Sequence, residues 1–127
     1  MKVDIHSEDA RGNIITTLTA NTIRFRGKRC VIPKGFESDG MSVPRMFWSI
    51  ISPHIDPRTQ RASICHDWIY REQPEGWTRK EADLMLYCYL LEDGFPVFLS
   101  SLSYRGVRLG GWIPWGANKS FKEATGE

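Results

Sequence analysis

His66 and Asp67 stand side by side within residues 62–70, where they place an imidazole next to a carboxylate. Asp83 follows after one short loop, and Asp39 precedes all of them in an Asp-Gly pair. An imidazole held by a carboxylate is a general base, and two further carboxylates can hold a hard cation. One histidine and three carboxylates on segments that could converge therefore indicate a hydrolytic site, without establishing one.

Two helices joined by a short loop are expected to position these residues. A proline at the first helical position, after an aspartate, predicts a helix over residues 57–71 with His66 on its inner side. A Thr-x-x-Glu capping box opens a second helix over residues 79–92. A loop of about six residues makes such helices antiparallel neighbours. Because His66 lies near the end of the first helix and Asp83 near the start of the second, we predict a hydrogen bond between them.

The same residues have an ordinary structural interpretation. A buried histidine paired with an aspartate between two helices often serves only as a polar pin for the core. Asp39 is a typical turn residue, and Tyr70 is a core residue or a hydrogen-bond partner in this interpretation. Both interpretations stay open, because an active site and an inactive remnant of one would contain the same residues.

The rest of the chain predicts a small α+β domain that includes all 127 residues. β-Branched, partly alternating runs predict strands over residues 13–33, with a tight turn that makes the last two a hairpin. Residues 34–56 are expected to form an ordered loop, residues 96–108 a third helix and residues 110–127 an irregular tail. The predicted architecture is a short N-terminal antiparallel sheet before a three-helix body that contains the antiparallel helical hairpin.

Composition limits the classes of function. The formal net charge is only +2, with basic residues scattered through both halves, so nucleic acid is not an expected partner. The N-terminus has no apolar segment typical of a signal peptide, and no stretch approaches the roughly 18 apolar residues of a transmembrane helix. Synthesis and folding in a cytoplasm are therefore expected. Three cysteines without CxxC spacing argue against a disulfide framework or a cysteine-based zinc site.

The C-terminal segment contains a second group of interest. Trp112, Ile113 and Trp115 lie among glycines and a proline, with Lys119 and Lys122 beyond them. Aromatic and basic side chains in this mixture are typical of segments at a bilayer interface. The alternative is that the tryptophans fold back and cap the helices.

Four separated motifs occur in order along residues 12–115. They are Ile-Pro-x-Gly-Phe-x-x-Asp-Gly-x-Ser-x-Pro at 32–44, His-Asp-x-x-Tyr at 66–70, Arg-x-x-Ala-Asp at 79–83 and Tyr-x-x-Val-Arg at 104–108. This order resembles a family of short phage and prophage proteins catalogued as a domain of unknown function. The resemblance implies a phage-encoded protein that is made in the host cytoplasm and is either free or associated with the virion.

His66-Asp67-x-x-Tyr70 on one helix, with Asp83 on the next, also resembles the catalytic helices of phospholipase A2, especially the small bacterial and fungal type. That resemblance implies that His66 is the catalytic base and that Asp83 orients it. It implies for Tyr70 a supporting hydrogen bond to Asp83. The implied reaction is hydrolysis of an ester, with a membrane phospholipid as the expected substrate, during phage entry or lysis.

The same resemblance implies calcium as the cofactor, held by Asp39 and Gly40 of one loop and by Asp67. Carboxylate and carbonyl oxygens of this kind suit Ca²⁺ rather than Zn²⁺. The chain departs from the phospholipase pattern in lacking its disulfides, in placing Cys65 directly before His66 and in reducing the calcium loop to an Asp-Gly pair. The rival hypothesis is a non-enzymatic virion or tail accessory protein whose partners are other virion proteins and whose His-Asp pair is structural.

Overall fold

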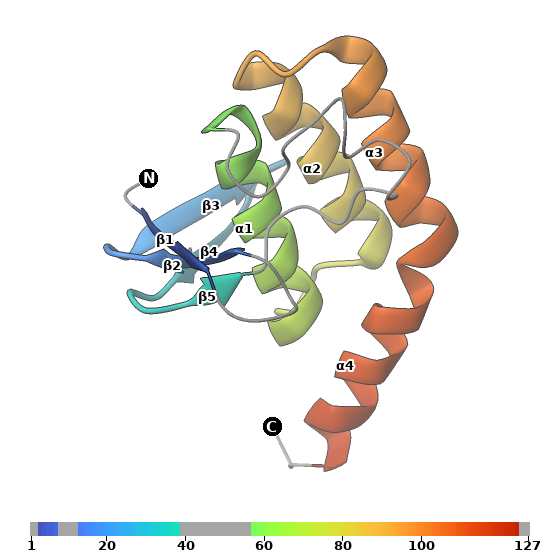
Figure 1. Cartoon of the computed structure of the whole chain (residues 1–127). Coiled ribbons are helices and arrows are strands. Elements are labelled where there is room, and N and C mark those ends of the chain that lie inside the picture. The colour runs from blue at the N-terminus through green and yellow to red at the C-terminus, as the bar shows by residue number, and fades with distance from the viewer. Residues whose placement is uncertain (1–2, 8–12, 39–56, 125–127) are drawn as a thin grey trace.

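The computed structural model describes residues 3–7, 13–38 and 57–124, and it places two small antiparallel sheets on one side of a group of four helices (Figure 1). The strands are β1 (Val3–Ser7), β2 (Asn13–Thr17), β3 (Asn21–Phe25), β4 (Lys28–Ile32) and β5 (Glu37–Ser38). The helices are α1 (Pro57–Glu72), α2 (Arg79–Glu92), α3 (Val97–Gly110) and α4 (Trp112–Ala124). The α+β class predicted from the sequence is confirmed.

Strands β3 and β4 form the predicted hairpin, paired from Asn21 opposite Ile32 to Phe25 opposite Lys28. Its turn contains Arg26 and Gly27, both with positive φ, as a tight two-residue hairpin turn requires. The other sheet has the order β1-β2-β5, and neither β1 nor β5 was predicted. Of the expected loop over 34–56, residues 37–38 form β5, and residues 39–56 lie outside the described part of the chain.

The hydrophobic core lies between the β3–β4 hairpin and the first two helices. Ile23 and Ile32 contribute one fully buried side chain from each strand of the hairpin. Lys28, at the start of β4, forms an ion pair with Glu81 and also donates to the Gly76 carbonyl in the loop before α2. The hairpin therefore fixes the position at which α2 begins.

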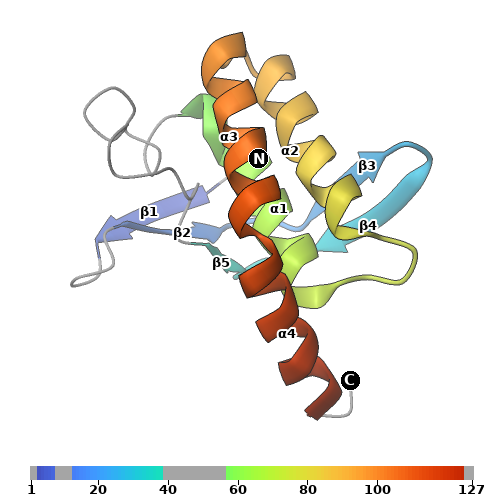
Figure 2. The ribbon, with the colours of Figure 1, turned by 90° about the vertical axis from the view of Figure 1, so that its right-hand side faces the viewer.

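The three predicted helices are confirmed, but the irregular tail predicted over 110–127 is wrong over most of its length. Residues Trp112–Ala124 form α4, which follows α3 directly (Figure 2). Pro114 is compatible with this helix because it occupies the first turn, where a missing backbone N–H costs little. Gly111, between α3 and α4, has a helical φ of −69°. No helix within the described ranges is long and apolar enough to cross a membrane.

Candidate functional site

The antiparallel pair α1 and α2 brings His66 to Asp83 as predicted. The capping box is present, because the Thr78 side chain accepts from the Glu81 backbone N–H and the Glu81 side chain accepts from the Thr78 N–H. This start places Asp83 in the second turn of α2, facing the end of α1. His66 Nε2 lies 2.8 Å from Asp83 Oδ1, so the predicted hydrogen bond is confirmed.

Tyr70 completes the contacts from α1. It lies one turn after His66, and its hydroxyl donates to the same oxygen, Asp83 Oδ1, at 2.6 Å. The two rings lie against each other, with centroids 4.2 Å apart. Burial and the hydrogen bond to Asp83 raise the pKa of the Tyr70 phenol, so it remains a neutral donor. The supporting hydrogen bond implied by the phospholipase resemblance is therefore present.

Two arginines approach the other carboxylate oxygen of Asp83, and neither was expected in the site. Arg108 of α3 donates from Nη1 to Oδ2 at 2.9 Å, and Arg79 of α2 lies 3.5 Å from the same atom. Arg79 also donates to the Val107 carbonyl at 3.1 Å. The i,i+4 spacing of Arg79 and Asp83 signals this pair in the sequence. Arg108 lies 25 positions after Asp83 in the sequence, so their contact could be predicted only from the position of α3.

The electrostatics of the site follow from Asp83, which is fully buried. Burial alone would raise the pKa of its carboxyl, but the hydrogen bonds from His66, Tyr70 and Arg108 outweigh burial and hold the pKa below its ordinary value. Asp83 is therefore ionised at neutral pH and only accepts hydrogen bonds.

The ionised carboxylate also fixes the tautomer of the neutral imidazole. Because Asp83 cannot donate, Nε2 of His66 carries the hydrogen and Nδ1 carries the lone pair. Among the described residues, none hydrogen-bonds to Nδ1, and the His66 side chain is 11% exposed. Nδ1 can accordingly accept a proton from a molecule that reaches it.

The junction between α3 and α4 closes over the other side of the site. Gly111 is buried there, and a Cβ at this position would lie 2.4 Å from the Tyr70 hydroxyl and 2.3 Å from the Val107 carbonyl oxygen. Trp115 packs edge-on against the Tyr70 ring, with centroids 5.1 Å apart, while its carbonyl accepts from Gln73 at 2.8 Å. Gly111 is thus required for the close approach of α4, and the sequence did not identify it as a site residue.

Of the calcium ligands predicted from the sequence, only Asp67 lies within the described residues. Asp39 and Gly40 lie outside the described residues, while Asp67 lies on α1 beside His66 and is half-buried. Within the described ranges, no three His, Cys, Asp or Glu side chains are grouped so that they could hold a metal ion. The donors proposed for calcium are all hard oxygen atoms, which is the chemistry that this ion prefers.

Cys65 is poorly suited to act as a nucleophile. It precedes His66 in α1, but its side chain faces the core. Burial raises the pKa of the Cys65 thiol to about 12, so the reactive thiolate is scarce at neutral pH.

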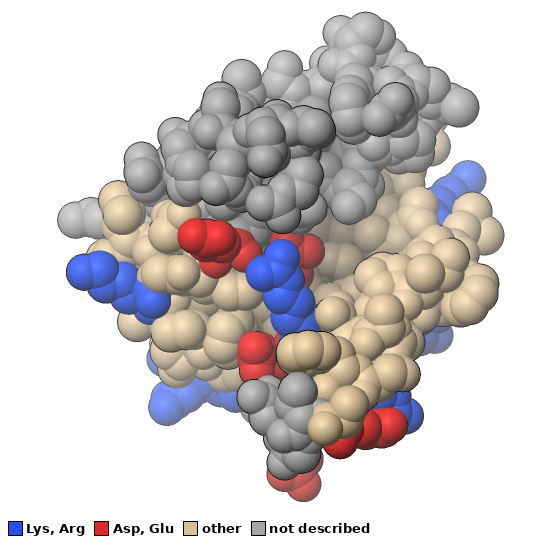
Figure 3. Space-filling model, turned by 60° about the horizontal axis from the view of Figure 1, so that its bottom comes forward, with Lys and Arg blue, Asp and Glu red and all other residues tan. Residues whose placement is uncertain are grey.

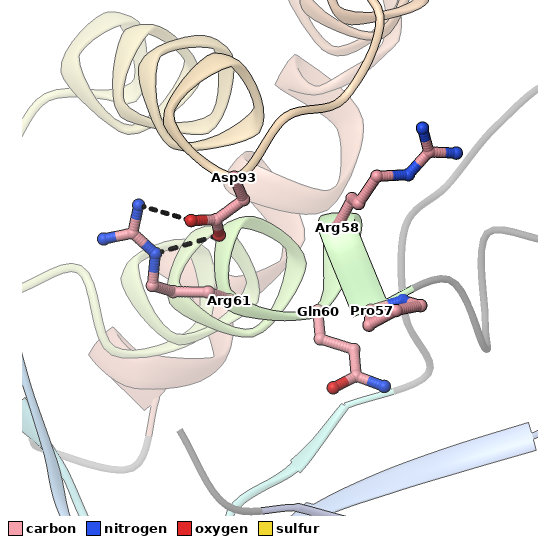
Figure 4. Close-up of a pocket in the computed structure, with 5 residues that line it drawn as sticks. All are labelled: Pro57, Arg58, Gln60, Arg61 and Asp93. Atoms are coloured by element: carbon pink, nitrogen blue, oxygen red, sulfur yellow. Dashed lines mark hydrogen bonds and ion pairs between the residues drawn. The ribbon is translucent and has the colours of Figure 1, made fainter.

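A hollow of about 390 Å³ lies at the start of α1, away from His66 (Figure 4). The described residues that line it are Pro57, Arg58, Gln60, Arg61 and Asp93. Arg61 points to Asp93 and donates to both of its carboxylate oxygens, at 3.0 and 3.1 Å, and it also donates to Glu92. These carboxylates neutralise the charge of Arg61 within the described lining of the hollow.

Comparison with known proteins places the chain in a family. The family described as "Protein of unknown function (DUF1353)" matches residues 17–107. This range includes the β3–β4 hairpin, helices α1 and α2, and α3 as far as Val107, the residue before Arg108. No curated protein sequence matched the chain significantly. No solved structure did so either.

Proposed function

The chain belongs to the DUF1353 family, whose function is unknown, and we propose that it is an ester hydrolase in which His66 is the general base. The observation that carries the proposal is the 2.8 Å contact between His66 Nε2 and an ionised, fully buried Asp83. This contact leaves Nδ1 of the neutral ring available as a base. A phospholipid is the proposed substrate and phage entry or lysis the proposed setting, on the resemblance of residues 66–70 and 83 to phospholipase A2 and of the ordered motifs to phage proteins.

In the proposed reaction, His66 Nδ1 takes a proton from water as the water oxygen bonds to the ester carbonyl carbon. The resulting imidazolium is stabilised by Asp83 through Nε2–H, and Tyr70 holds the carboxylate in place. Collapse of the tetrahedral intermediate breaks the carbon–oxygen bond to the alcohol, which receives the proton from His66. A calcium ion held by Asp39, Gly40 and Asp67 would supply an electrophile for the carbonyl oxygen.

The test is hydrolysis of a soluble chromogenic ester and of phospholipid vesicles by the purified full-length chain. We expect His66→Asn to lower kcat by at least about a hundredfold, because general-base catalysis contributes on the order of 10²–10⁴. His66→Gln is the second variant, because the glutamine amide nitrogen can take the place of Nε2 and keep an N–H donor for Asp83. It has no basic nitrogen, so it should remain folded and show the same loss of kcat. Tyr89→Phe is the matched control, because Tyr89 hydrogen-bonds to the backbone of Arg24, away from Asp83. Equal rates for the wild type and His66→Asn would refute the proposal.

A second candidate is favoured by the two arginines on Asp83. Arg108 and Arg79 neutralise the Asp83 carboxylate, and the ion pair with Arg108 joins α3 to α2. A buried polar cluster with only a structural role would need these contacts. In this candidate the chain is a virion or tail accessory protein without activity. It predicts that His66→Asn changes the melting temperature alone, with no ester hydrolysis by any variant.

A further inference from the structure

Helices α3 and α4 form one nearly continuous arm on the face turned to the viewer in Figure 2. The Gly111 N–H donates to the Val107 carbonyl and the Trp115 N–H donates to the Gly111 carbonyl, so helical hydrogen bonding continues through the junction. Arg108 and Trp115 on the inner side of the arm contact Asp83 and Tyr70. The side of the arm opposite the buried residues Ser100, Ser103 and Gly111 faces away from the core.

Four large apolar side chains lie exposed along that opposite side, which we call the outer stripe. Their exposed fractions are 80% for Leu109, 71% for Phe98, 63% for Trp112 and 60% for Ile113. At about 100° per residue, these four positions fall within about 100° of arc and extend over about 22 Å of helix. In Figure 3 an uncharged area at the right corresponds to the place where α3 and α4 lie.

Helix α3 carries apolar side chains on two sides. Leu99 and Val107 pack against the hydrophobic core, on the side that also buries Ser100 and Ser103. Phe98 and Leu109 face outward instead. A surface helix normally turns its apolar stripe toward the core and its polar residues toward water. The outer stripe is therefore surplus to folding, and contiguous exposed apolar surface of this kind marks a binding face.

The charges around the outer stripe indicate the chemistry of its partner. Residues 97–124 contain four basic residues and one acidic residue, Glu123. Two of the basic side chains serve the fold, because Arg108 binds Asp83 and Lys122 donates to the Glu72 carbonyl. Arg105 and Lys119 are exposed, and no described residue forms an ion pair with either.

We propose that the outer stripe is a docking surface for an anionic lipid bilayer. Apolar side chains with a tryptophan would enter the boundary between headgroups and acyl chains, while Arg105 and Lys119 would meet the anionic headgroups. A second copy of the chain is a poorer occupant, because it would bring the same cations together. A nucleic acid is also a poorer occupant, because its backbone offers nothing to bury Leu109 and Ile113.

The idea that a hydrolase uses this surface to reach phospholipid rests on the proposed function. Binding of lipid by the surface does not itself require His66. The two proposals therefore fail separately. His66→Asn should bind vesicles like the wild type, whereas a change in the outer stripe should leave hydrolysis of a soluble ester unchanged.

The experiment measures cosedimentation and tryptophan fluorescence of the full-length chain with vesicles of phosphatidylglycerol or of phosphatidylcholine. We expect binding to phosphatidylglycerol, with a blue shift that Trp112→Phe removes and added salt weakens. Leu109→Glu and Ile113→Glu should each lower the partition coefficient at least about tenfold, given the transfer free energy of a leucine-sized side chain. Both sites are exposed, so circular dichroism should show an unchanged fold.

The matched control is Val31→Glu, which places the same charge on the exposed strand β4, on the opposite side of the molecule in Figure 1. It should bind phosphatidylglycerol like the wild type. Equal loss in Val31→Glu, or equal binding to both lipids, would overturn the proposal. So would a dimer that binds no vesicles and is dissociated by Leu109→Glu, because the stripe would then be an interface between copies.

Discussion

The inner and outer faces of the α3–α4 arm treat polarity in opposite ways. The inner face surrounds a fully buried carboxylate with polar partners, including Arg108, and fits Gly111 against the Tyr70 hydroxyl. The outer face exposes Phe98 and Leu109 to solvent. Buried charge is expensive unless every partner is present, whereas exposed apolar surface costs the fold little. We therefore expect stability to depend on the inner face and binding on the outer one.

The largest effect should come from Asp83 itself. Asp83→Asn removes the charge that compensates Arg108 and Arg79, and breaking a buried pair in this way costs about 3–5 kcal/mol of unfolding free energy. Leu109→Ala on the outer face should change the unfolding free energy by less than about 0.5 kcal/mol. Urea denaturation measures both. Similar losses in the two variants would erase the distinction between the faces.

The second-largest loss of stability should come from a substitution at Gly111. Gly111→Ala forces a Cβ against the Tyr70 hydroxyl and the Val107 carbonyl, and overpacking of this kind costs about 1–3 kcal/mol. Gly106→Ala is the matched control, because a Cβ there meets nothing within 4 Å. In the middle of α3 it should stabilise the protein by about 0.5–1 kcal/mol. If Gly111→Ala is also neutral or stabilising, α4 does not pack as tightly as described.

The helical half of the site was predictable because its signals are local. The capping box at Thr78 sets the start of α2, and a short loop makes α1 and α2 antiparallel, so His66 and Asp83 had to lie close together. Which face of α1 is buried follows from the spacing of its apolar residues. These signals depend on sequence separations of a few residues.

The remainder depended on contacts between distant segments. Arg108 reaches Asp83 only because α3 packs on α2, and nothing near either residue specifies that distance. Helix α4 was missed because glycine and proline weigh against a helix, whereas Pro114 is harmless in a first turn. The tryptophans divide between the two expectations for them, since Trp115 folds back onto Tyr70 and Trp112 is exposed.

Acid should weaken the inner face specifically. The pKa of Asp83 is lower in the folded chain than the value of about 3.9 for an unfolded aspartate, so its carboxylate stabilises the fold above that value. This stabilisation is lost as the pH falls through the lower, folded pKa. The wild type should therefore lose unfolding free energy below about pH 4 more steeply than Asp83→Asn. Parallel pH profiles for the two proteins would show that Asp83 is not held ionised by its partners.

Calcium should change the stability less than Asp83→Asn does. If the ion binds only the folded chain, calcium at about ten times its Kd adds about 1.4 kcal/mol and raises the melting temperature. Asp39→Asn or Asp67→Asn should abolish the shift, while Leu109→Glu on the outer face should retain it. No shift at millimolar calcium in scanning calorimetry would remove the electrophile from the proposed reaction.

The most direct test of the account is the tautomer of His66, measured from the ¹⁵N chemical shifts of the neutral imidazole in the full-length chain. An ionised Asp83 requires the hydrogen on Nε2 and a free lone pair on Nδ1. We expect this tautomer in the wild type. A wild-type ring that carries its hydrogen on Nδ1 would contradict the proposed reaction, because the basic nitrogen would then be Nε2, which faces Asp83 and not water.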